Sequence, residues 1–206
     1  MYFAKGRLEI SERQLQNWYV RDKKSAQEIA TLLRCSTHKV NYAMERYQIQ
    51  KRSISEAIYA KNNPNGDPFR FREPKTLEDA KLFGMGMGLY WGEGTKADLG
   101  SVRLGNTDPG LSKTFIRFLV EIYGIQKKDL RFGLQIFTDM SVHETLAFWQ
   151  KELRIDKRQF YKPIITKSRS LGTYRKKSKY GVLTVYYSNK KLRNLLIKQL
   201  DDMRPE

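Results

Sequence analysis

The residues with the clearest chemical potential are three glycines and a carboxylate in the segment 82–96, LFGMGMGLYWGEGTK. Gly84, Gly88 and Gly92 recur every four residues, so they share one face of a helix, and Glu93 directly follows the last of them. Each glycine inside a helix costs about 1 kcal/mol relative to alanine. A helix that accepts this cost usually gains close approach to another backbone. We expect that partner to be the same helix of a second copy, in a homodimer.

Glu93 is the candidate catalytic residue and metal ligand. We expect it at the C-terminal end of the helix, where a negative charge opposes the helix dipole by a few tenths to about 1 kcal/mol. Two paired helices would also bring two Glu93 carboxylates together, and a divalent cation would relieve both penalties. Mg²⁺ takes few carboxylates and keeps water or phosphate oxygens as its other ligands, so beside DNA it can activate water. The competing interpretation is tight packing within one chain, with Glu93 paired to Lys96.

A second candidate site lies in the segment 25–42, SAQEIATLLRCSTHKVNY. Ser25 and Glu28 have the spacing of a capping box, and Ser36 or Thr37 can cap the next helix. The spacing resembles the helix-turn-helix of bacterial regulators, with small Ala30 where two helices must approach closely. Such a motif places its second helix in the major groove of DNA. The alternative is an ordinary three-helix packing unit.

The exposed face of that second helix carries side chains that suit bases or phosphates. Asparagine can bond adenine through two hydrogen bonds, and Ser, Thr, His and Lys can reach bases or phosphate oxygens. Lys51 and Arg52 follow, either as a phosphate clamp or as a solvated helix end. The candidate DNA-binding residues of this part are Ser36, Thr37, His38, Lys39, Asn41, Tyr42, Lys51 and Arg52.

A third candidate site is a basic segment, 167–179, KSRSLGTYRKKSK, between the last two expected strands. A two-stranded ribbon fits the major groove, so we expect a basic hairpin that grips phosphates; the alternative is a solvated loop. Its cations are Lys167, Arg169, Arg175, Lys176, Lys177 and Lys179. On the polar face of the neighbouring sheet we expect Arg103, Arg131, Gln135, Lys162 and Thr184.

The segment 82–96 resembles the signature helix of the LAGLIDADG homing endonucleases, especially variants that end in Gly-Glu-Gly. The stretches 102–111 (VRLGNTDPGL), 118–125 (FLVEIYGI) and 148–155 (FWQKELRI) are similar to later parts of the same family, so the resemblance spans about residues 77–200. It implies that Glu93 binds the catalytic metal, that Gly84 and Gly88 pack helix against helix, and that strand residues read bases.

The sequence departs from the family pattern in three respects. Trp91 stands where the family has an earlier aspartate, the single signature helix requires a homodimer, and the domain is compact. Related domains have lost their acidic residues and become transcription regulators, one of them attached to a helix-turn-helix. The resemblance therefore implies either a Mg²⁺-dependent, site-specific endonuclease or a non-cleaving DNA-binding regulator.

The elements that must position these residues form two domains. Apolar residues recur at helical spacing from Ile10 to Ser53, and the proline-rich and Asn-Gly-containing segment 60–76 reads as a linker. The sequence predicts an α+β protein: a helix-turn-helix domain over 1–59 and a LAGLIDADG-like domain with an antiparallel sheet over 77–206. In the second domain we expect helices over 77–92, 109–123, 141–153 and 190–203, and strands around 102–104, 130–136, 160–166 and 180–188.

Composition agrees with a polyanionic partner. The chain of 206 residues has 39 Lys and Arg against 22 Asp and Glu, a net charge of +17. The excess lies in residues 1–75 and 155–206, whereas residues 76–154 balance ten basic against ten acidic side chains. We expect double-stranded DNA as the partner. A ribosome- or RNA-binding protein is the alternative, but an aromatic RNA-stacking run is absent.

The remaining composition limits other classes of protein. One cysteine, Cys35, and two histidines disfavour disulfides and zinc sites. The sequence lacks both an apolar run of about 18 residues and a secretory signal, so we expect no membrane partner and a cytoplasmic, nucleoid-associated location.

Overall fold

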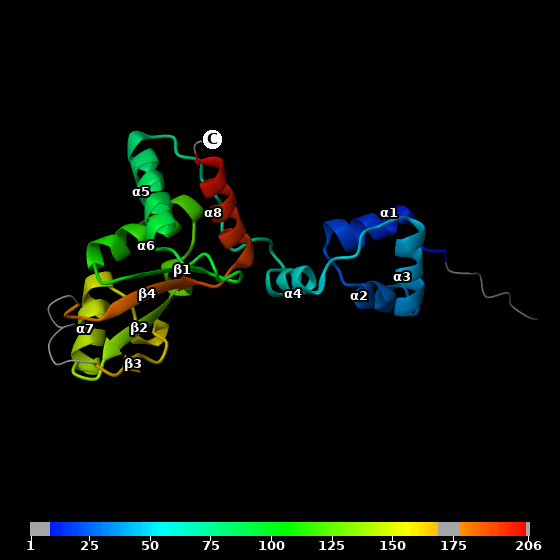
Figure 1. Cartoon of the computed structure of the whole chain (residues 1–206). Coiled ribbons are helices and arrows are strands. Elements are labelled where there is room, and N and C mark those ends of the chain that lie inside the picture. The colour runs from blue at the N-terminus through cyan, green and yellow to red at the C-terminus, as the bar shows by residue number, and fades with distance from the viewer. Residues whose placement is uncertain (1–8, 169–177, 205–206) are drawn as a thin grey trace, which may run out of the picture. The chain divides into compact units, whose positions relative to one another are not determined.

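The computed structural model describes residues 9–168 and 178–204 of the chain and divides it into two compact units. The division falls between Pro68 and Phe69, inside the segment 60–76 that the sequence marks as a linker. Figure 1 shows a helical first unit and a second unit in which helices accompany a sheet. The described part of the chain is therefore a mixed α+β protein.

The first unit is held together at its helix starts by capping boxes. Ser11 begins α1 with Gln14, and Ser25 begins α2 with Glu28, so both predicted boxes are confirmed. A third box, Ser53 with Glu56, begins a further helix, α4, that the sequence interpretation missed. The elements of this unit are α1 (Glu12–Leu15), a π-helical segment (Gln16–Arg21), α2 (Ala26–Leu32), α3 (Thr37–Arg46) and α4 (Ile54–Asn62).

The helix-turn-helix geometry depends on a small hydrophobic core. Leu15, Ile29, Val40 and Met44 are fully buried together, and Ala30 is 1% exposed where α2 meets α3. The core therefore fixes α3 by one face and leaves its opposite face to solvent.

The second unit alternates helices with strands. Its α6 starts at Pro109 behind the cap Asp108 and stops at Gly124, which takes the left-handed conformation that glycine tolerates. The elements are α5 (Leu77–Glu93), β1 (Val102–Asn106), α6 (Pro109–Tyr123), β2 (Arg131–Phe137), α7 (Val142–Leu153), β3 (Ile164–Thr166), β4 (Val182–Tyr187) and α8 (Lys190–Asp202), with short 3₁₀ segments at Lys127–Asp129 and Lys157–Gln159.

The sheet has the order β1-β4-β2-β3 and is mixed. The pairs β1–β4 and β2–β4 are antiparallel, but β2 and β3 are parallel, so the expectation of an antiparallel sheet is wrong at this edge. The reason is the connection: α7 carries the chain back across the sheet before β3 begins, as parallel pairing requires. Strand β3 is also shorter than the predicted strand 160–166, because Lys157–Gln159 forms a 3₁₀ turn and only Ile164–Thr166 pairs as a strand.

This strand order also contradicts the expected hairpin between the last two strands. Strand β2 lies between β3 and β4, so these two strands do not pair and their connection is not a hairpin turn. Lys167 and Lys179 flank the connection and are exposed. The other expected hairpin cations, Arg169, Arg175, Lys176 and Lys177, lie outside the described residues.

Alternate strand residues face a single hydrophobic core that the helices cover. Val102, Leu104, Phe132, Leu134 and Val185 are at most 1% exposed, and α5, α6, α7 and α8 contribute buried side chains to the same cluster. The intervening strand residues are therefore left on the other, open face of the sheet.

The end of the expected linker belongs to the second unit. Phe69 and Phe71 pack against its core, and the backbone N–H of Arg72 donates to the carbonyl oxygen of Ile122 at 2.8 Å. The first residues of the expected linker instead complete α4, which ends at Asn62. The segment 60–76 is thus a connector only in its middle.

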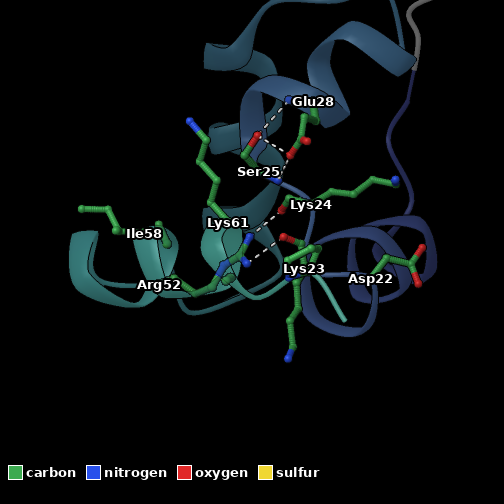
Figure 2. Close-up of a pocket in the computed structure, with 11 residues that line it drawn as sticks. Asp22, Lys23, Lys24, Ser25, Glu28, Arg52, Ile58 and Lys61 are labelled. Atoms are coloured by element: carbon green, nitrogen blue, oxygen red, sulfur yellow. Dashed lines mark hydrogen bonds between the residues drawn. The ribbon is translucent and has the colours of Figure 1, made fainter. Parts of the chain in front are cut away.

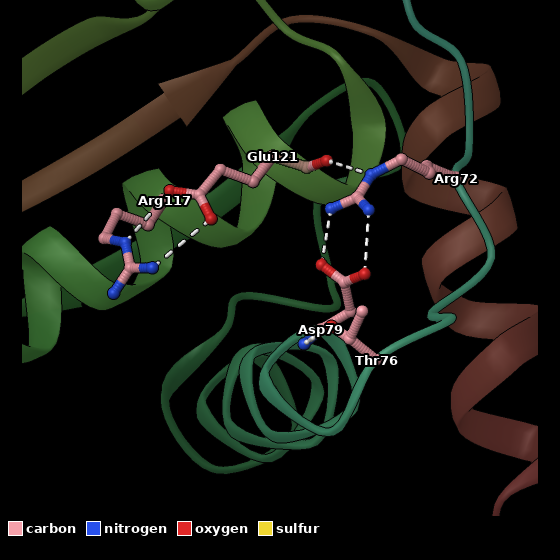
Figure 3. Close-up of polar contacts among 5 residues, drawn as sticks. All are labelled: Arg72, Thr76, Asp79, Arg117 and Glu121. Atoms are coloured by element: carbon pink, nitrogen blue, oxygen red, sulfur yellow. Dashed lines mark hydrogen bonds and ion pairs between the residues drawn. The ribbon is translucent and has the colours of Figure 1, made fainter.

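Arg72 fixes the start of α5, as Figure 3 shows. Its guanidinium donates two hydrogen bonds to the carboxylate of Asp79, at 2.8 and 2.7 Å, and a third to the carbonyl oxygen of Glu121. These bonds from Arg72, together with that from Thr76, lower the pKa of Asp79 to about 2. The first turn of α5 is therefore tied to α6, which sets the position of the helix that carries the glycines and Glu93.

Candidate nucleic-acid interface

The exposed face of α3 collects polar side chains. Val40, Ala43 and Met44 are buried, so His38, Lys39 and Tyr42 point away from the core, and Tyr42 is 64% exposed. The same three residues line, together with Arg46, a surface cavity of about 720 Å³. Helical spacing places Asn41 at the edge of this face, half-buried.

Two of the expected reading residues have structural partners. The Ser36 hydroxyl caps α3 by accepting from the backbone N–H of Lys39, which decides between Ser36 and Thr37 as the cap. The Thr37 hydroxyl donates to the side-chain oxygen of Gln27 at 2.6 Å and links the first turns of α2 and α3. Both residues therefore orient α3, and the side chains available for direct contact are His38, Lys39, Asn41 and Tyr42.

Arg52 is a brace within the first unit, as Figure 2 shows. Its guanidinium donates to the carbonyl oxygens of Lys23 and Lys24, and its central carbon lies 4.4 Å from the ring centroid of Tyr19. Lys51 donates to Glu45 at 2.6 Å in an exposed ion pair. Neither side chain is presented as an uncommitted phosphate clamp, and the sequence could not show this because the carbonyl partners of Arg52 come from a turn 28 residues earlier.

The glycine face of α5 is open. A Cβ atom added at Gly84, Gly88 or Gly92 would meet nothing within 4 Å in the described structure. The glycine that packs within the chain is Gly86, whose added Cβ would lie 2.1 Å from Cγ of Phe118 on α6. Intramolecular packing thus explains Gly86 but not the three-glycine stripe. Exposed apolar side chains accompany the stripe on α5: Leu77, Met85 and Trp91.

Glu93 is the last residue of α5 and is exposed. The ammonium of Lys96 donates to the carbonyl oxygen of Trp91, and no ion pair joins Lys96 to Glu93 among the described residues. Burial lowers the pKa of Lys96, and the negative charge of Glu93 opposes that shift. The expected Glu93–Lys96 pair is therefore replaced by a longer-range attraction.

The chain after Glu93 is held in place by fixed contacts. Gly94 forms a bridge with Leu104 of β1, which joins the helix end directly to the sheet. The carboxylate of Asp98 accepts from the backbone N–H groups of Gly100 and Ser101 and pairs with Arg103. Asp98, the next acidic residue, is therefore already committed to the loop.

One chain gives Glu93 as an isolated candidate metal ligand. Within residues 9–168 and 178–204, no group of three or more His, Cys, Asp or Glu side chains could hold a metal ion. A Mg²⁺ site at this position would need a carboxylate from elsewhere, such as Glu93 of a second copy.

The open face of the sheet combines cations with an aromatic side chain. The register aligns Arg103 of β1, Tyr186 of β4 and Arg131 of β2 in one row across the sheet. Arg103 lies over the ring of Tyr186 at 5.1 Å, and the ring of Tyr161 meets Tyr186 edge-on at 5.4 Å. The expected residues Arg103 and Arg131 are thus brought together.

The next rows of this face contain small and neutral polar residues. Thr184 stands between Gly105 and Gly133, and a Cβ at Gly133 would come within 2.9 Å of the Tyr186 ring. Gln135 donates to the hydroxyl of Thr166 at 3.3 Å. Lys162 is exposed but precedes β3, so it does not lie in a strand.

Tyr186 and Tyr161 are the site residues that the sequence interpretation missed. The alternation of buried and half-buried residues over Val182–Tyr187 puts Tyr186 on the same face as Thr184. That signal was present in the sequence for Tyr186. For Tyr161 no such signal existed, because it lies outside a regular strand and its backbone N–H bonds to the carbonyl oxygen of Phe132.

Comparison with known proteins gives no assignment. No family model matches the chain, and neither the curated proteins nor the solved structures contain a significant match. In the described part of the chain, none of the helices has the length and apolar character needed to cross a membrane.

Proposed function

We propose that this protein is a sequence-specific binder of double-stranded DNA. The observation that carries the proposal is α3: its start is capped, its buried spine is packed on α2, and its polar face is open to solvent. This arrangement suits a recognition helix in the major groove. The net charge of +17 supplies the attraction to phosphate that any such binding needs.

The second unit supplies another DNA-contacting surface in this proposal. Arg103 and Arg131 lie on the open sheet face beside neutral polar residues, a combination that can pair phosphate contact with base contact. The resemblance of the segment 82–96 to the LAGLIDADG signature helix supports the same use of the sheet.

We further propose that two copies pair through the open glycine face of α5. Gly84, Gly88 and Gly92 leave room for a second backbone, and Met85 and Trp91 would be removed from water by it. Symmetry would then give the dimer two copies of each DNA-contacting surface and a preference for a two-fold symmetric site.

The DNA-binding proposal is tested by changing Asn41. Selection from a random duplex library should enrich a defined sequence, and Asn41→Ala should lower affinity for that sequence by about 5- to 100-fold, the value of one good base contact. Binding to random duplex should change little. Asn17→Ala, which removes an exposed amide from the π-helical segment, is the matched control. Enrichment that is unaffected by Asn41→Ala contradicts base reading by this side chain, and a preference for structured RNA over duplex contradicts the whole proposal.

A second candidate function is Mg²⁺-dependent phosphodiester hydrolysis. The observation that favours it is Glu93, an exposed carboxylate at the end of a helix whose glycine face is open. In a dimer, Glu93 of both copies would hold the ion, which would supply an activated water and stabilise the leaving oxygen. The rest of the chain would hold the duplex across that point.

Cleavage is tested with the selected duplex, Mg²⁺ and Glu93→Gln. If the protein is a nuclease, wild type should cut within the site, and Glu93→Gln should bind equally well but lose at least about 100-fold in cutting rate. Glu78→Gln, the same charge change at the other end of α5, should cut normally. Binding without cutting by wild type assigns the protein to the alternative class, a non-cleaving regulator.

A further inference from the structure

A basic cavity lies between α6 and α7, with a volume of about 490 Å³. Its polar lining consists of five cationic side chains and a single carboxylate: Lys113, Arg117, Lys127, Lys151, Arg154 and Glu152. By contrast, the cavity beside Arg52 in the first unit balances four cations with two carboxylates. The α6–α7 cavity therefore has an unusual local excess of positive charge.

Ion pairs within the protein neutralise only part of this excess. Lys113 pairs with Glu152 at 2.6 Å, and Arg117 pairs with Glu121 at 3.0 Å, the latter visible in Figure 3. Among the described residues, Lys151 and Arg154 form no ion pair, and both are exposed.

The fifth cation, Lys127, shows the effect of this crowding. Its ammonium donates to the carbonyl oxygen of Leu153 at 2.5 Å and so covers the negative end of α7, which would otherwise repel an anion. Burial lowers the pKa of Lys127, and the charge of Arg154 lowers it further. A bound anion would relieve the repulsion between these cations.

The excess is a product of folding and not of local composition. Residues 76–154, which include all the cations of the cavity, carry no net charge. Their acidic side chains are used elsewhere: Asp79 bonds Arg72, and Asp98 bonds Arg103. The fold thus gathers cations from the end of α7, from α6 and from the turn before β2 into one cavity.

We propose that the α6–α7 cavity binds a phosphate-bearing ligand, at a site separate from α3 and from the open face of the sheet. Several converging N–H donors and a guanidinium are the groups that bind phosphate oxygens most strongly. The helices cover the opposite side of the sheet from the open face, so a duplex on that face does not occupy this cavity. The inference does not depend on the DNA-binding proposal.

The test uses tripolyphosphate as the probe and calorimetric titration of the full-length protein. The double variant Lys151→Gln, Arg154→Gly removes two cations. Arg154 has a φ of 50°, in the left-handed region that glycine prefers, so this change should not strain the backbone. Wild type should bind saturably, and the variant should bind at least about tenfold more weakly.

Two controls make the result specific. Lys190→Gln, Lys198→Gln removes the same charge from α8 and should bind like wild type, as should the charge-conserving pair Lys151→Arg, Arg154→Lys. An absence of saturable binding by wild type overturns the proposal, and so does an equal loss in the α8 variant. Circular dichroism of each variant distinguishes loss of the site from loss of the fold.

A second measurement identifies the source of the phosphate. If the ligand is a nucleic-acid backbone, the salt dependence of binding to a 30-base-pair duplex should fall in the Lys151→Gln, Arg154→Gly variant by about 0.9 in log–log slope for each phosphate lost. If tripolyphosphate binding is lost but this slope is unchanged, the ligand is a free polyphosphate or nucleotide. Both results keep the phosphate site and differ only in its occupant.

Discussion

Gly86→Ala should destabilise the second unit by about 1–3 kcal/mol, whereas Gly88→Ala, two residues away on the same helix, should be neutral or stabilise it by up to about 1 kcal/mol. The added methyl at Gly86 would lie 2.1 Å from Cγ and 2.7 Å from Cβ of Phe118, so α5 and α6 must separate or the ring must move. The same methyl at Gly88 meets nothing within 4 Å and gains the helix propensity of alanine.

Urea denaturation followed by circular dichroism measures both variants under the same conditions. Gly84→Ala serves as a second open position and should behave like Gly88→Ala. Equal destabilisation at Gly86 and Gly88 would contradict the packing of α5 on α6 through Gly86. This comparison matters for function because it separates the glycine needed for folding from those available to a partner.

Gly88→Leu should leave the fold intact but weaken self-association on the order of 100-fold. The leucine side chain points into open space in one chain, but in a dimer paired through α5 it would be inserted twice, at about 1–3 kcal/mol of overpacking each. Sedimentation equilibrium over a range of protein concentrations measures the change, and Gly88→Ala is the conservative control. A dimer that survives Gly88→Leu with unchanged affinity must use another surface.

A monomer in the wild-type protein would also be informative. DNA could then still be read by α3, but Glu93 would lack the second carboxylate that the cleavage proposal requires. The two association experiments therefore decide whether Glu93→Gln should be expected to affect cutting at all.

Helix starts are the features that local sequence determined best. Ser11, Ser25 and Asn189 precede helices that begin one residue later, because a side-chain oxygen at this position satisfies backbone N–H groups that the helix leaves unpaired. The same chemistry was present at Ser53, but the nearby prolines and Asn-Gly suggested a linker, and α4 was missed. Strand alternation likewise predicted β1, β2 and β4, because their inward residues face one core.

Pairing between distant strands was beyond local patterns. Alternation indicates which residues face the core but not which strand lies beside which, so the insertion of β2 between β3 and β4 was not predicted. The same limit applies to Arg52, since a basic residue after a helix has one appearance in sequence whether it faces solvent or the carbonyl oxygens of Lys23 and Lys24.

The glycine helix contains both kinds of information. The sequence by itself determined that Gly84, Gly88 and Gly92 share a face and that Glu93 ends the helix, because both follow from the helical repeat and the change to Gly94. Only the tertiary structure decided which face α6 occupies: Phe118 meets Gly86, which lies on another side of α5, and this leaves the three-glycine face uncovered. It also decided that a segment with no net charge contains a strongly basic cavity, because charges are brought together by contacts between elements and not by their order along the chain.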